Sequence, residues 1–366
     1  MADFSLLIKP VGAVCNLQCS YCYYSGGQTI PRWPPGPTGF MNEAVLERTI
    51  SAYMATDQSV YSMVWHGGEP TLLPVSFYEK AIELQKKHAA KGSRISNSLQ
   101  TNGVNISEDL AELLAKYRFL CGVSLDGPAE VHDKYRRTTS GKPTHHRVQT
   151  GMQTLSAAGV MTNVAVVVSM ANVHSPVATY RYLRNIGSTH LHFIPCVEWD
   201  ENGNPSDESI TAEQWGTFLV SIFKEWHKHD IGKVSVRLFE SILAKLVRGI
   251  NMDCYNSDKC DRYLVVEANG DIYPCDFYVA PEYRLANIMD ITFTEIRELH
   301  KYREFARRKT NWSTQCNTCH FVNLCKGDCR KFRPGATNQS RLCDGWKIFY
   351  SHTLPFFLEI AGRISP

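Results

Sequence analysis

The first two thirds of the chain repeat one pattern: a short apolar run ends in a polar or glycine-bearing turn, and a helical stretch follows. Six such runs occur, at residues 5–11, 61–70, 95–103, 119–128, 160–170 and 191–199. Helices are expected between them, for example around Phe77–Ala89 and Glu108–Tyr117. Strands that alternate with helices form a parallel sheet with right-handed crossovers. The pattern therefore predicts an α/β fold, a partial (β/α)6 barrel related to the eight-unit barrel.

Polar motifs stand at the C-terminal ends of the predicted strands. They are the cysteines after the first strand, Gly67–Pro70, Gln100–Gly103, Ser124 with Asp126, and Cys196. Barrels of this kind carry their chemistry at that end of the sheet. We therefore expect these motifs to meet at one site.

The character of the chain changes after about residue 235, where the predicted strands become short and eight of the thirteen cysteines follow. A chain of 366 residues is also longer than one core usually holds. The sequence thus predicts two domains, a barrel over residues 1–235 and a smaller cysteine-rich domain over residues 236–366. Residues 25–39, rich in Pro and Gly, are expected to form a loop beside the site.

Composition and charge exclude several classes of protein. With 43% hydrophobic and 20% charged residues the chain is typical of a globular protein, and its net charge of +3 indicates no nucleic-acid partner. No apolar run is long enough for a membrane span, and the N-terminal apolar stretch lacks the basic region and cleavage site of a signal peptide. We therefore expect a cytoplasmic protein. In that reducing compartment, closely spaced cysteines indicate metal ligands and not disulfides.

Cys15, Cys19 and Cys22 stand in the spacing C-x3-C-x2-C, with the next cysteine about a hundred residues away. Three protein ligands leave one metal position open, and an open position is typical of a catalytic site. The stretch therefore indicates an iron–sulfur cluster that takes an exogenous ligand. The alternative is a closed zinc site with a distant fourth ligand. Cys121 could serve by count, but it lies in an apolar strand and suits a buried core thiol better.

The residues Cys15–Cys22, with an aromatic residue before the last cysteine, and the later Gly67–Pro70 turn resemble the radical S-adenosylmethionine enzymes. The resemblance implies that the three cysteines hold a [4Fe–4S] cluster. It also implies that the amino and carboxylate groups of S-adenosylmethionine bind the free iron. The Gly-Gly-Glu-Pro turn would bind the amino group, since backbone and Glu oxygens can accept from an ammonium.

The same resemblance implies a set of contacts to S-adenosylmethionine. They are Tyr21, Gly67, Gly68, Glu69, Ser124, Arg136 and Val197. Arg137 serves equally well as the carboxylate partner, and for either arginine the alternative is a solvated surface charge. For Val197 the alternative is core packing. His66 and Tyr24 flank the expected cavity, although packing explains them nearly as well.

Six cysteines of the second predicted domain form the spacings C-x5-C and C-x2-C-x5-C-x3-C, and two more stand singly. This pattern resembles the SPASM extension of radical S-adenosylmethionine enzymes. Eight thiols suffice for two fully ligated [4Fe–4S] clusters. The resemblance implies that one cluster is held by Cys254, Cys260, Cys275 and Cys329. It implies that the other is held by Cys316, Cys319, Cys325 and Cys343. Two zinc sites are the alternative. Core packing is expected for the two cysteines left over, Cys121 and Cys196. For Cys196, which ends a predicted strand, the alternative is a position facing the cavity.

Asp276 directly follows Cys275 in the segment YPCDFY. In isolation it would be a turn aspartate bonded to the local backbone. Together with the LLIKP opening and the NSLQTNG, SLDGP and LCKGDCR segments, however, it resembles the anaerobic sulfatase-maturating enzymes over nearly the whole chain. That resemblance implies that Asp276 is the catalytic base.

The resemblance implies a complete reaction. Electron transfer from the first cluster cleaves S-adenosylmethionine, and the resulting 5′-deoxyadenosyl radical removes hydrogen from the β carbon of a cysteine or serine in a sulfatase. Asp276 takes the side-chain proton, and the second electron leaves to an auxiliary cluster. The product is Cα-formylglycine. The sequence does not choose between a cysteine and a serine substrate.

Two rival functions remain open at the sequence level. A SPASM peptide maturase that forms thioether or carbon–carbon crosslinks shares the same motifs, but many such enzymes carry an extra N-terminal domain, for which a first strand at residue 5 leaves no room. A non-catalytic electron carrier would not need the open triad. The expected partners are an unfolded or nascent sulfatase polypeptide and a low-potential electron donor such as flavodoxin or ferredoxin. The chain is expected to act as a monomer, without nucleic acid or membrane.

Overall fold

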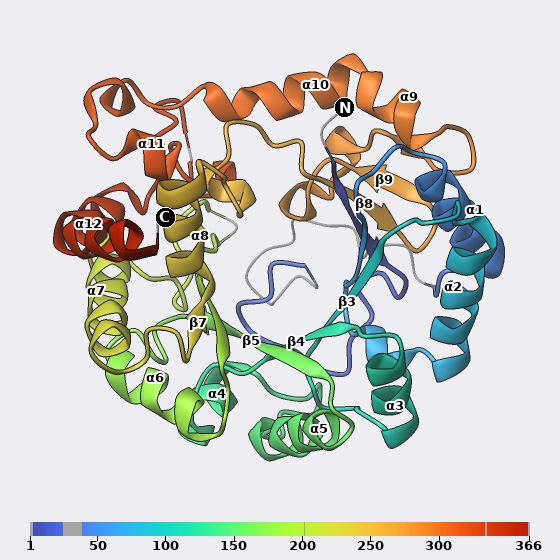
Figure 1. Cartoon of the computed structure of the whole chain (residues 1–366), viewed down its shortest axis with the longest axis horizontal. Coiled ribbons are helices and arrows are strands. Elements are labelled where there is room, and N and C mark those ends of the chain that lie inside the picture. Colours follow the sequence, from blue (N-terminus) through green and yellow to red (C-terminus); the bar gives the residue numbers. More distant parts are fainter. Residues whose placement is uncertain (1–2, 25–38, 201, 334, 365–366) are drawn as a thin grey trace. The chain divides into compact units, whose positions relative to one another are not determined.

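The computed structural model describes residues 3–24, 39–200, 202–333 and 335–364 (Figure 1). The predicted loop at residues 25–39 lies outside the described residues except for its last position. The chain divides into two compact units. Unit 1 comprises Met1–Ser124, Arg136–Thr162 and Cys260–Ala306, and unit 2 comprises Leu125–Tyr135, Asn163–Lys259 and Arg307–Pro366. Each unit therefore draws on both predicted domains, and the boundary at residue 235 stays a prediction.

Unit 1 is built on a sheet whose first four strands are parallel and adjacent in chain order. They are β1 (Ser5–Lys9), β2 (Tyr61–Trp65), β3 (Ile95–Thr101) and β4 (Leu120–Ser124). The other edge of β1 pairs in parallel with β8 (Tyr263–Glu267). Antiparallel β9 (Asp271–Tyr273) and β10 (Ala286–Asn287) continue the sheet beyond β8. Residues from the second predicted domain thus complete the sheet of the first.

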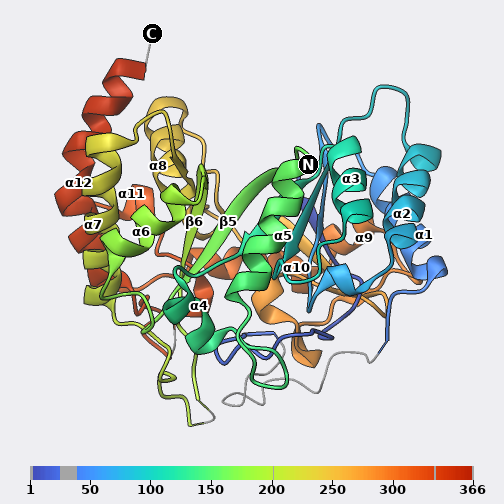
Figure 2. The same cartoon turned by 90° about the horizontal axis from the view of Figure 1, so that it is seen from below.

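Helices cover the outer side of this sheet, and α1, α2 and α3 lie next to one another there (Figures 1 and 2). The helices of unit 1 are α1 (Glu43–Met54), α2 (Val75–His88), α3 (Glu108–Lys116), α5 (His145–Ala157), α9 (Phe293–Glu298) and α10 (His300–Arg307), whose last residue belongs to unit 2. Asn42 caps α1 through a bond from the Val45 amide at 2.9 Å, and Ser107 caps α3 in the same way at 3.2 Å. The two helices expected from the sequence are therefore confirmed within two residues.

Unit 2 contains a second parallel group of strands, in the order β5, β6, β7. The strands are β5 (Met161–Val168, in unit 2 from residue 163), β6 (His190–Pro195) and β7 (Ser235–Val236). The helices are α4 (Ala129–Tyr135), α6 (Pro176–Asn185), α7 (Ala212–His229), α8 (Arg237–Arg248), α11 (Val322–Cys325) and α12 (Cys343–Ile364). All six predicted strands are thus present as β1 to β6, and the α/β fold is confirmed.

Helices α7 and α12 cross at two glycines. A Cβ on Gly216 would lie 2.6 Å from the Gly345 carbonyl oxygen, and a Cβ on Gly345 would lie 2.1 Å from that of Ala212. Only glycine permits so close an approach of two backbones. The crossing positions the start of α12, where Cys343 lies. No helix of the described residues is long and apolar enough to cross a membrane.

Candidate active site

Cys15, Cys19 and Cys22 lie in the loop that follows β1. A β-bridge between Leu17 and Thr138 holds the middle of this loop. The Leu17 amide donates to Cys15 Sγ at 3.3 Å, and the Cys22 amide donates to the Cys19 carbonyl at 3.1 Å. All three are reduced, partly buried thiols. Three thiols on one short loop form a donor set that fits an iron–sulfur cluster.

The Gly67–Pro70 turn after β2 lies directly against this cysteine loop. The Gly68 amide donates to the Gly12 carbonyl at 2.7 Å. A Cβ on Gly68 would lie 2.0 Å from the Val14 carbonyl oxygen, so no other residue fits there. Gly67 has a φ of +117°, which also favours glycine. The two glycines therefore allow the contact between two motifs that stand about fifty residues apart in the sequence.

Glu69 is buried and fastens this turn to the end of β3. Its Oε1 accepts from the Thr71 amide at 3.0 Å and from the Thr71 and Thr101 hydroxyls at 2.7 Å each, and its Oε2 accepts from the Asn102 amide at 2.7 Å. Burial raises the pKa of Glu69, and these hydrogen bonds oppose the rise. Four protein donors engage the carboxylate, so Glu69 stabilises the turn. Its direct contact with an ammonium group stays a prediction.

Arg136 and Tyr21 pair beside the cysteine loop. Arg136 is buried, and its Nη1 donates to the Tyr21 hydroxyl at 3.1 Å. Arg137 is exposed, and its guanidinium donates to a backbone carbonyl of its own loop. Ser124 ends β4, where its hydroxyl accepts from Gln100 at 3.3 Å. Of the two candidate arginines, the geometry therefore favours Arg136.

Asp276 begins a short 3-10 helix immediately after Cys275. The Lys9 ammonium lies 2.5 Å from its Oδ1, and the Tyr23 hydroxyl donates to its Oδ2. Burial raises the pKa of Asp276, but the charges of Lys9 and His66 and the hydrogen bonds outweigh that effect and leave a pKa of about 2. The side chain is therefore a fixed, ionised carboxylate.

Lys9, Tyr23 and Glu267 were not predicted as site residues, yet they surround Asp276. Lys9 has no exposed surface, lies 3.7 Å from Glu267 Oε1, and places its ammonium 3.5 Å from the centre of the Tyr24 ring. The Tyr24 hydroxyl donates to Glu267 Oε2 at 2.6 Å. A lysine that ends an otherwise apolar strand was the available signal, because a buried charge is costly unless it is paired.

His66 and Tyr24 belong to the same cluster. The Gly67 amide donates to His66 Nδ1 at 2.7 Å. Burial lowers the pKa of His66, the Asp276 charge acts against this, and the Lys9 charge adds to it. The His66 ring therefore interacts electrostatically with both Lys9 and Asp276.

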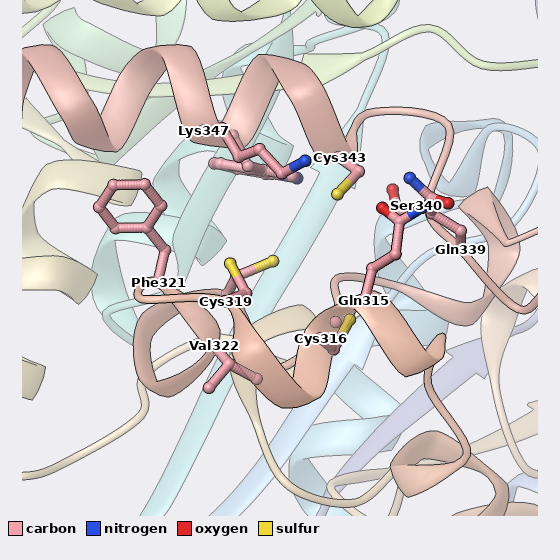
Figure 3. Close-up of a pocket in the computed structure, with 12 residues that line it drawn as sticks. Gln315, Cys316, Cys319, Phe321, Val322, Gln339, Ser340, Cys343 and Lys347 are labelled. Carbon is pink, nitrogen blue, oxygen red and sulfur yellow. The ribbon is translucent and has the colours of Figure 1, made fainter.

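One hollow in unit 2 is lined by four cysteines. They are Cys316, Cys319, Cys325 and Cys343, the four that the sequence resemblance groups into one cluster. Figure 3 shows the sulfur atoms of Cys319 and Cys343 facing each other across the hollow, with Lys347 beside them. The cysteines come from the loop before α11, from α11 itself and from the first residue of α12. Four converging soft thiol donors fit a [4Fe–4S] cluster.

The other four downstream cysteines are divided between the units. Cys254 and Cys329 belong to unit 2, and Cys260 and Cys275 belong to unit 1. Burial raises the pKa of Tyr302, and the charges of Asp261, Cys260 and Cys275 add to that rise. None of the four lines the hollow in unit 2.

The two cysteines expected to pack in the core, Cys121 and Cys196, are indeed buried and expose at most 3% of their surface. Val197, predicted as a contact to S-adenosylmethionine, is also buried. Burial raises the pKa of Cys121 to about 12 and also raises that of Cys196. Val197 lies in unit 2, and its contact with an adenine stays a prediction.

Family models agree with this division of chemistry along the chain. Residues 10–183 match the radical SAM superfamily, and residues 254–320 match an iron–sulfur cluster-binding domain, SPASM. A serine-type anaerobic sulfatase-maturating enzyme of Bacteroides thetaiotaomicron is 36% identical over 96% of this chain and 89% of its own length. A cysteine-type anaerobic sulfatase-maturating enzyme of Clostridium perfringens is 33% identical over the full length of both chains.

Solved structures give the same result. The structure of native anSMEcpe with bound AdoMet and Kp18Cys peptide is 33% identical and superposes with a TM-score of 0.92, covering 99% of this chain and 100% of that one. Streptococcus suis SuiB bound to its precursor peptide SuiA reaches a TM-score of 0.67 at 14% identity over 93% of this chain and 76% of that one, so it shares the fold. The chain belongs to the anaerobic sulfatase-maturating enzymes, the radical SAM oxidoreductases that carry a SPASM iron–sulfur domain.

Proposed function

We propose that this chain oxidises a cysteine or serine side chain of a sulfatase to Cα-formylglycine, with Asp276 as the base. The observation that carries the proposal is the Asp276 carboxylate held 2.5 Å from the buried Lys9 ammonium. It lies in the same compact unit as the Cys15–Cys22 loop. A fixed, unprotonated carboxylate near a radical-generating loop is suited to receive the proton that the substrate must lose.

The proposed ligands follow the sequence assignment. Cys15, Cys19 and Cys22 would hold the first [4Fe–4S] cluster, and Tyr21, Gly67, Gly68, Glu69, Ser124, Arg136 and Val197 would contact S-adenosylmethionine. Cys254, Cys260, Cys275 and Cys329 would hold one auxiliary cluster, and Cys316, Cys319, Cys325 and Cys343 the other. When bound, the first cluster and S-adenosylmethionine supply a 5′-deoxyadenosyl radical that abstracts hydrogen, and the auxiliary clusters supply one-electron acceptors.

The chain's own residues would accept the proton that the substrate side chain loses. The target side chain loses one hydrogen atom from Cβ, one proton from sulfur or oxygen, and one further electron, which together make a thioaldehyde or an aldehyde. Lys9 holds Oδ1 of Asp276 and Tyr23 holds Oδ2, so one of these two contacts would give way when Asp276 takes the proton. The Lys9 charge keeps the carboxylate ionised before the transfer. Hydrolysis of a thioaldehyde gives the same formylglycine.

Several finer assignments belong to this proposal. The domain boundary at residue 235 is supported by family-model matches that end at residue 183 and resume at residue 254. A low-potential electron donor such as flavodoxin or ferredoxin, action as a monomer and a cytoplasmic location rest on the sequence. The substrate is proposed to be an unfolded or nascent sulfatase segment, by analogy with the peptide bound to the related anSMEcpe.

Replacing the base tests the proposal. Anaerobic, reconstituted wild type and Asp276→Asn are incubated with S-adenosylmethionine and two peptides, one with C-x-P-x-R and one with S-x-P-x-R. We expect the wild type to convert at least one peptide to formylglycine. Asp276→Asn should retain its iron and cleave S-adenosylmethionine, yet form product at least about a hundredfold more slowly. Mass spectrometry measures both products.

The same experiment separates the remaining alternatives. Formylglycine from Asp276→Asn at the wild-type rate would show that another group is the base. A crosslinked peptide from the wild type would identify a peptide maturase, and unchanged peptides would contradict sulfatase maturation. Asp290→Asn, an exposed aspartate of the same unit, is the matched control and should convert peptide at the wild-type rate.

A further inference from the structure

The tripeptide Lys326–Gly327–Asp328, which we call the ligand linker, joins Cys325 to Cys329. The proposed ligand assignment gives these two cysteines to different auxiliary clusters, and the inference below depends on that assignment. All three linker residues have positive φ values, of 50°, 68° and 64°. Residues other than glycine rarely adopt this left-handed backbone conformation. Such a run persists only where its surroundings hold it.

Two buried cations bind the carbonyl oxygens of the ligand linker. The Lys309 ammonium donates to the carbonyls of Lys326 at 3.1 Å and Asp328 at 2.5 Å. Arg333 donates through Nε to the Gly327 carbonyl at 2.6 Å, and through Nη2 to those of Lys326 at 3.0 Å and Asp328 at 2.6 Å. Lys309 and Arg333 expose only 1% and 6% of their surfaces. Every carbonyl of the linker therefore accepts a bond from a buried cation.

The linker is also held from its side-chain face. Asp328 is buried, and its carboxylate accepts from the Cys329 amide at 2.7 Å, the Ser340 hydroxyl at 2.6 Å and Trp346 Nε1 at 2.9 Å. Trp346 lies on α12, three residues after Cys343. The linker, the two cations and the start of α12 thus form one hydrogen-bonded block inside unit 2.

Lys309 also reaches the second ligand loop of unit 2. Its ammonium donates to the Tyr255 carbonyl at 2.7 Å, next to Cys254. The proposed assignment places Cys254 and Cys329 on the same auxiliary cluster. One buried ammonium therefore fastens the backbone beside two ligands of that cluster, and it also binds the linker that leads to the other cluster.

The two positive charges also lie close to a proposed ligand. Lys309 and Arg333 both donate to the carbonyl of Lys326, the residue directly after Cys325, at 3.1 Å and 3.0 Å. Cys325 and Gly327 line the hollow in unit 2. A cation that stabilises negative charge at the thiolates also favours the reduced cluster, which is one charge more negative than the oxidised one.

We infer that Lys309 and Arg333 are positioning residues for the auxiliary clusters: they fix the ligand linker, and with it Cys325 and Cys329, and their charges raise the reduction potential of the clusters bound there. This role differs from ligation, because both side chains donate their N–H groups to backbone carbonyls. The electron affinity of the auxiliary clusters would then depend on Lys309 and Arg333, two residues that are not cluster ligands.

Redox titration tests the inference without substrate or turnover. The full chain carrying Cys15→Ala, Cys19→Ala and Cys22→Ala would bind only the auxiliary clusters, about eight irons. In this background Lys309→Met and Arg333→Met are reconstituted anaerobically, and electron paramagnetic resonance follows cluster reduction. The Met variants are compared with the background protein at the midpoint potential of the latter. There we expect the ratio of reduced to oxidised cluster in each Met variant to be about tenfold lower, which corresponds to a shift of about 59 mV for a one-electron couple. Lys309→Arg should restore most of the ratio.

A control variant and the iron content separate the possible outcomes of this titration. Lys233→Met, an exposed lysine of unit 2, should leave the potential unchanged. A full iron content with unchanged potentials in both Met variants would overturn the inference. If the Met variants lose iron, retention of iron by Lys309→Arg supports the inference and its loss overturns it. Zinc, or far fewer than eight irons, in the background protein would instead contradict the ligand assignment of the proposed function.

Discussion

At the residue scale, the site depends on charges that the fold removes from water. Lys9 is fully buried and is paired with Asp276 and Glu267, and the Glu267 carboxylate in turn accepts from Tyr24. Breaking a buried pair leaves the remaining charge without compensation, and that cost exceeds the value of any exposed pair. Stability and catalysis are therefore coupled at Lys9.

Replacing Lys9 tests this coupling. Lys9→Met should lower the free energy of unfolding by about 3 kcal/mol, because Asp276 and Glu267 would stay buried without their cation. It should also slow formylglycine formation at least about tenfold, since Asp276 would lose a contact that orients it. Anaerobic denaturant titration and peptide mass spectrometry measure the two effects.

The matched control is Lys80→Met in the same unit. Lys80 pairs with Glu43 at 3.0 Å, but the side chains are 35% and 67% exposed. This replacement should lower the free energy of unfolding far less than Lys9→Met does, and it should leave product formation unchanged. Equal costs for Lys9→Met and Lys80→Met would contradict the importance of burial at Lys9.

At the element scale, the turn after β2 and the loop after β1 form one unit because glycine lets their backbones touch. The Gly68 amide bonds to the Gly12 carbonyl, and the space for a Cβ on Gly68 is filled by Val14. Glu69 then ties the turn to β3. The C-terminal ends of three neighbouring parallel strands are thereby connected by direct hydrogen bonds.

A methyl group at Gly68 should separate these elements. Gly68→Ala would place its Cβ 2.0 Å from the Val14 carbonyl, so the cysteine loop must move. We expect iron to fall from about twelve to about eight per chain, as the first cluster is lost, and cleavage of S-adenosylmethionine to fall with it. Iron assay and chromatography of 5′-deoxyadenosine provide the measurements.

Gly362→Ala is the control for that substitution. Gly362 lies in α12, and a Cβ added there would meet no neighbouring atom within 4 Å, so alanine should be accepted and should slightly favour the helix. Full iron and full cleavage in Gly68→Ala would show that the contact between turn and loop does not support the first cluster.

At the scale of the whole molecule, the thirteen cysteines divide into eleven proposed ligands and two core residues. The proposed ligands are all partly buried, reduced thiols, whereas Cys121 and Cys196 are fully buried. The exposure of each thiol therefore agrees with the role assigned to it.

The iron content of the whole chain follows from this division. Cys121→Ala with Cys196→Ala should retain about twelve irons per chain and cleave S-adenosylmethionine normally, because neither thiol is a ligand. By contrast, Cys325→Ala should remove about four irons. Zinc in place of iron, or loss of iron from the double variant, would refute the assignment of three clusters.

Features that depend on neighbouring residues could be predicted from the sequence, whereas contacts between distant parts of the chain could not. The six strands, the helices around Phe77 and Glu108 and the cysteine groups follow from local patterns, since alternation and spacing are properties of short segments. The pairing of β8 with β1 joins residues more than 250 positions apart, and no local pattern reports such a pairing. For the same reason Lys9 and Glu267, which are brought together by that pairing, were missed as site residues.

What the sequence determined by itself is therefore the kind of chemistry: an open three-cysteine loop, a glycine turn that suits an amino group, eight further cysteines and an aspartate after one of them. Ligand spacing on one loop is a matter of chain geometry and needs no fold. Only the tertiary structure decided which charges meet. It showed Asp276 held by Lys9, and the ligand linker held by Lys309 and Arg333, because burial turns a lysine at the end of a strand or a turn into a fixed cation.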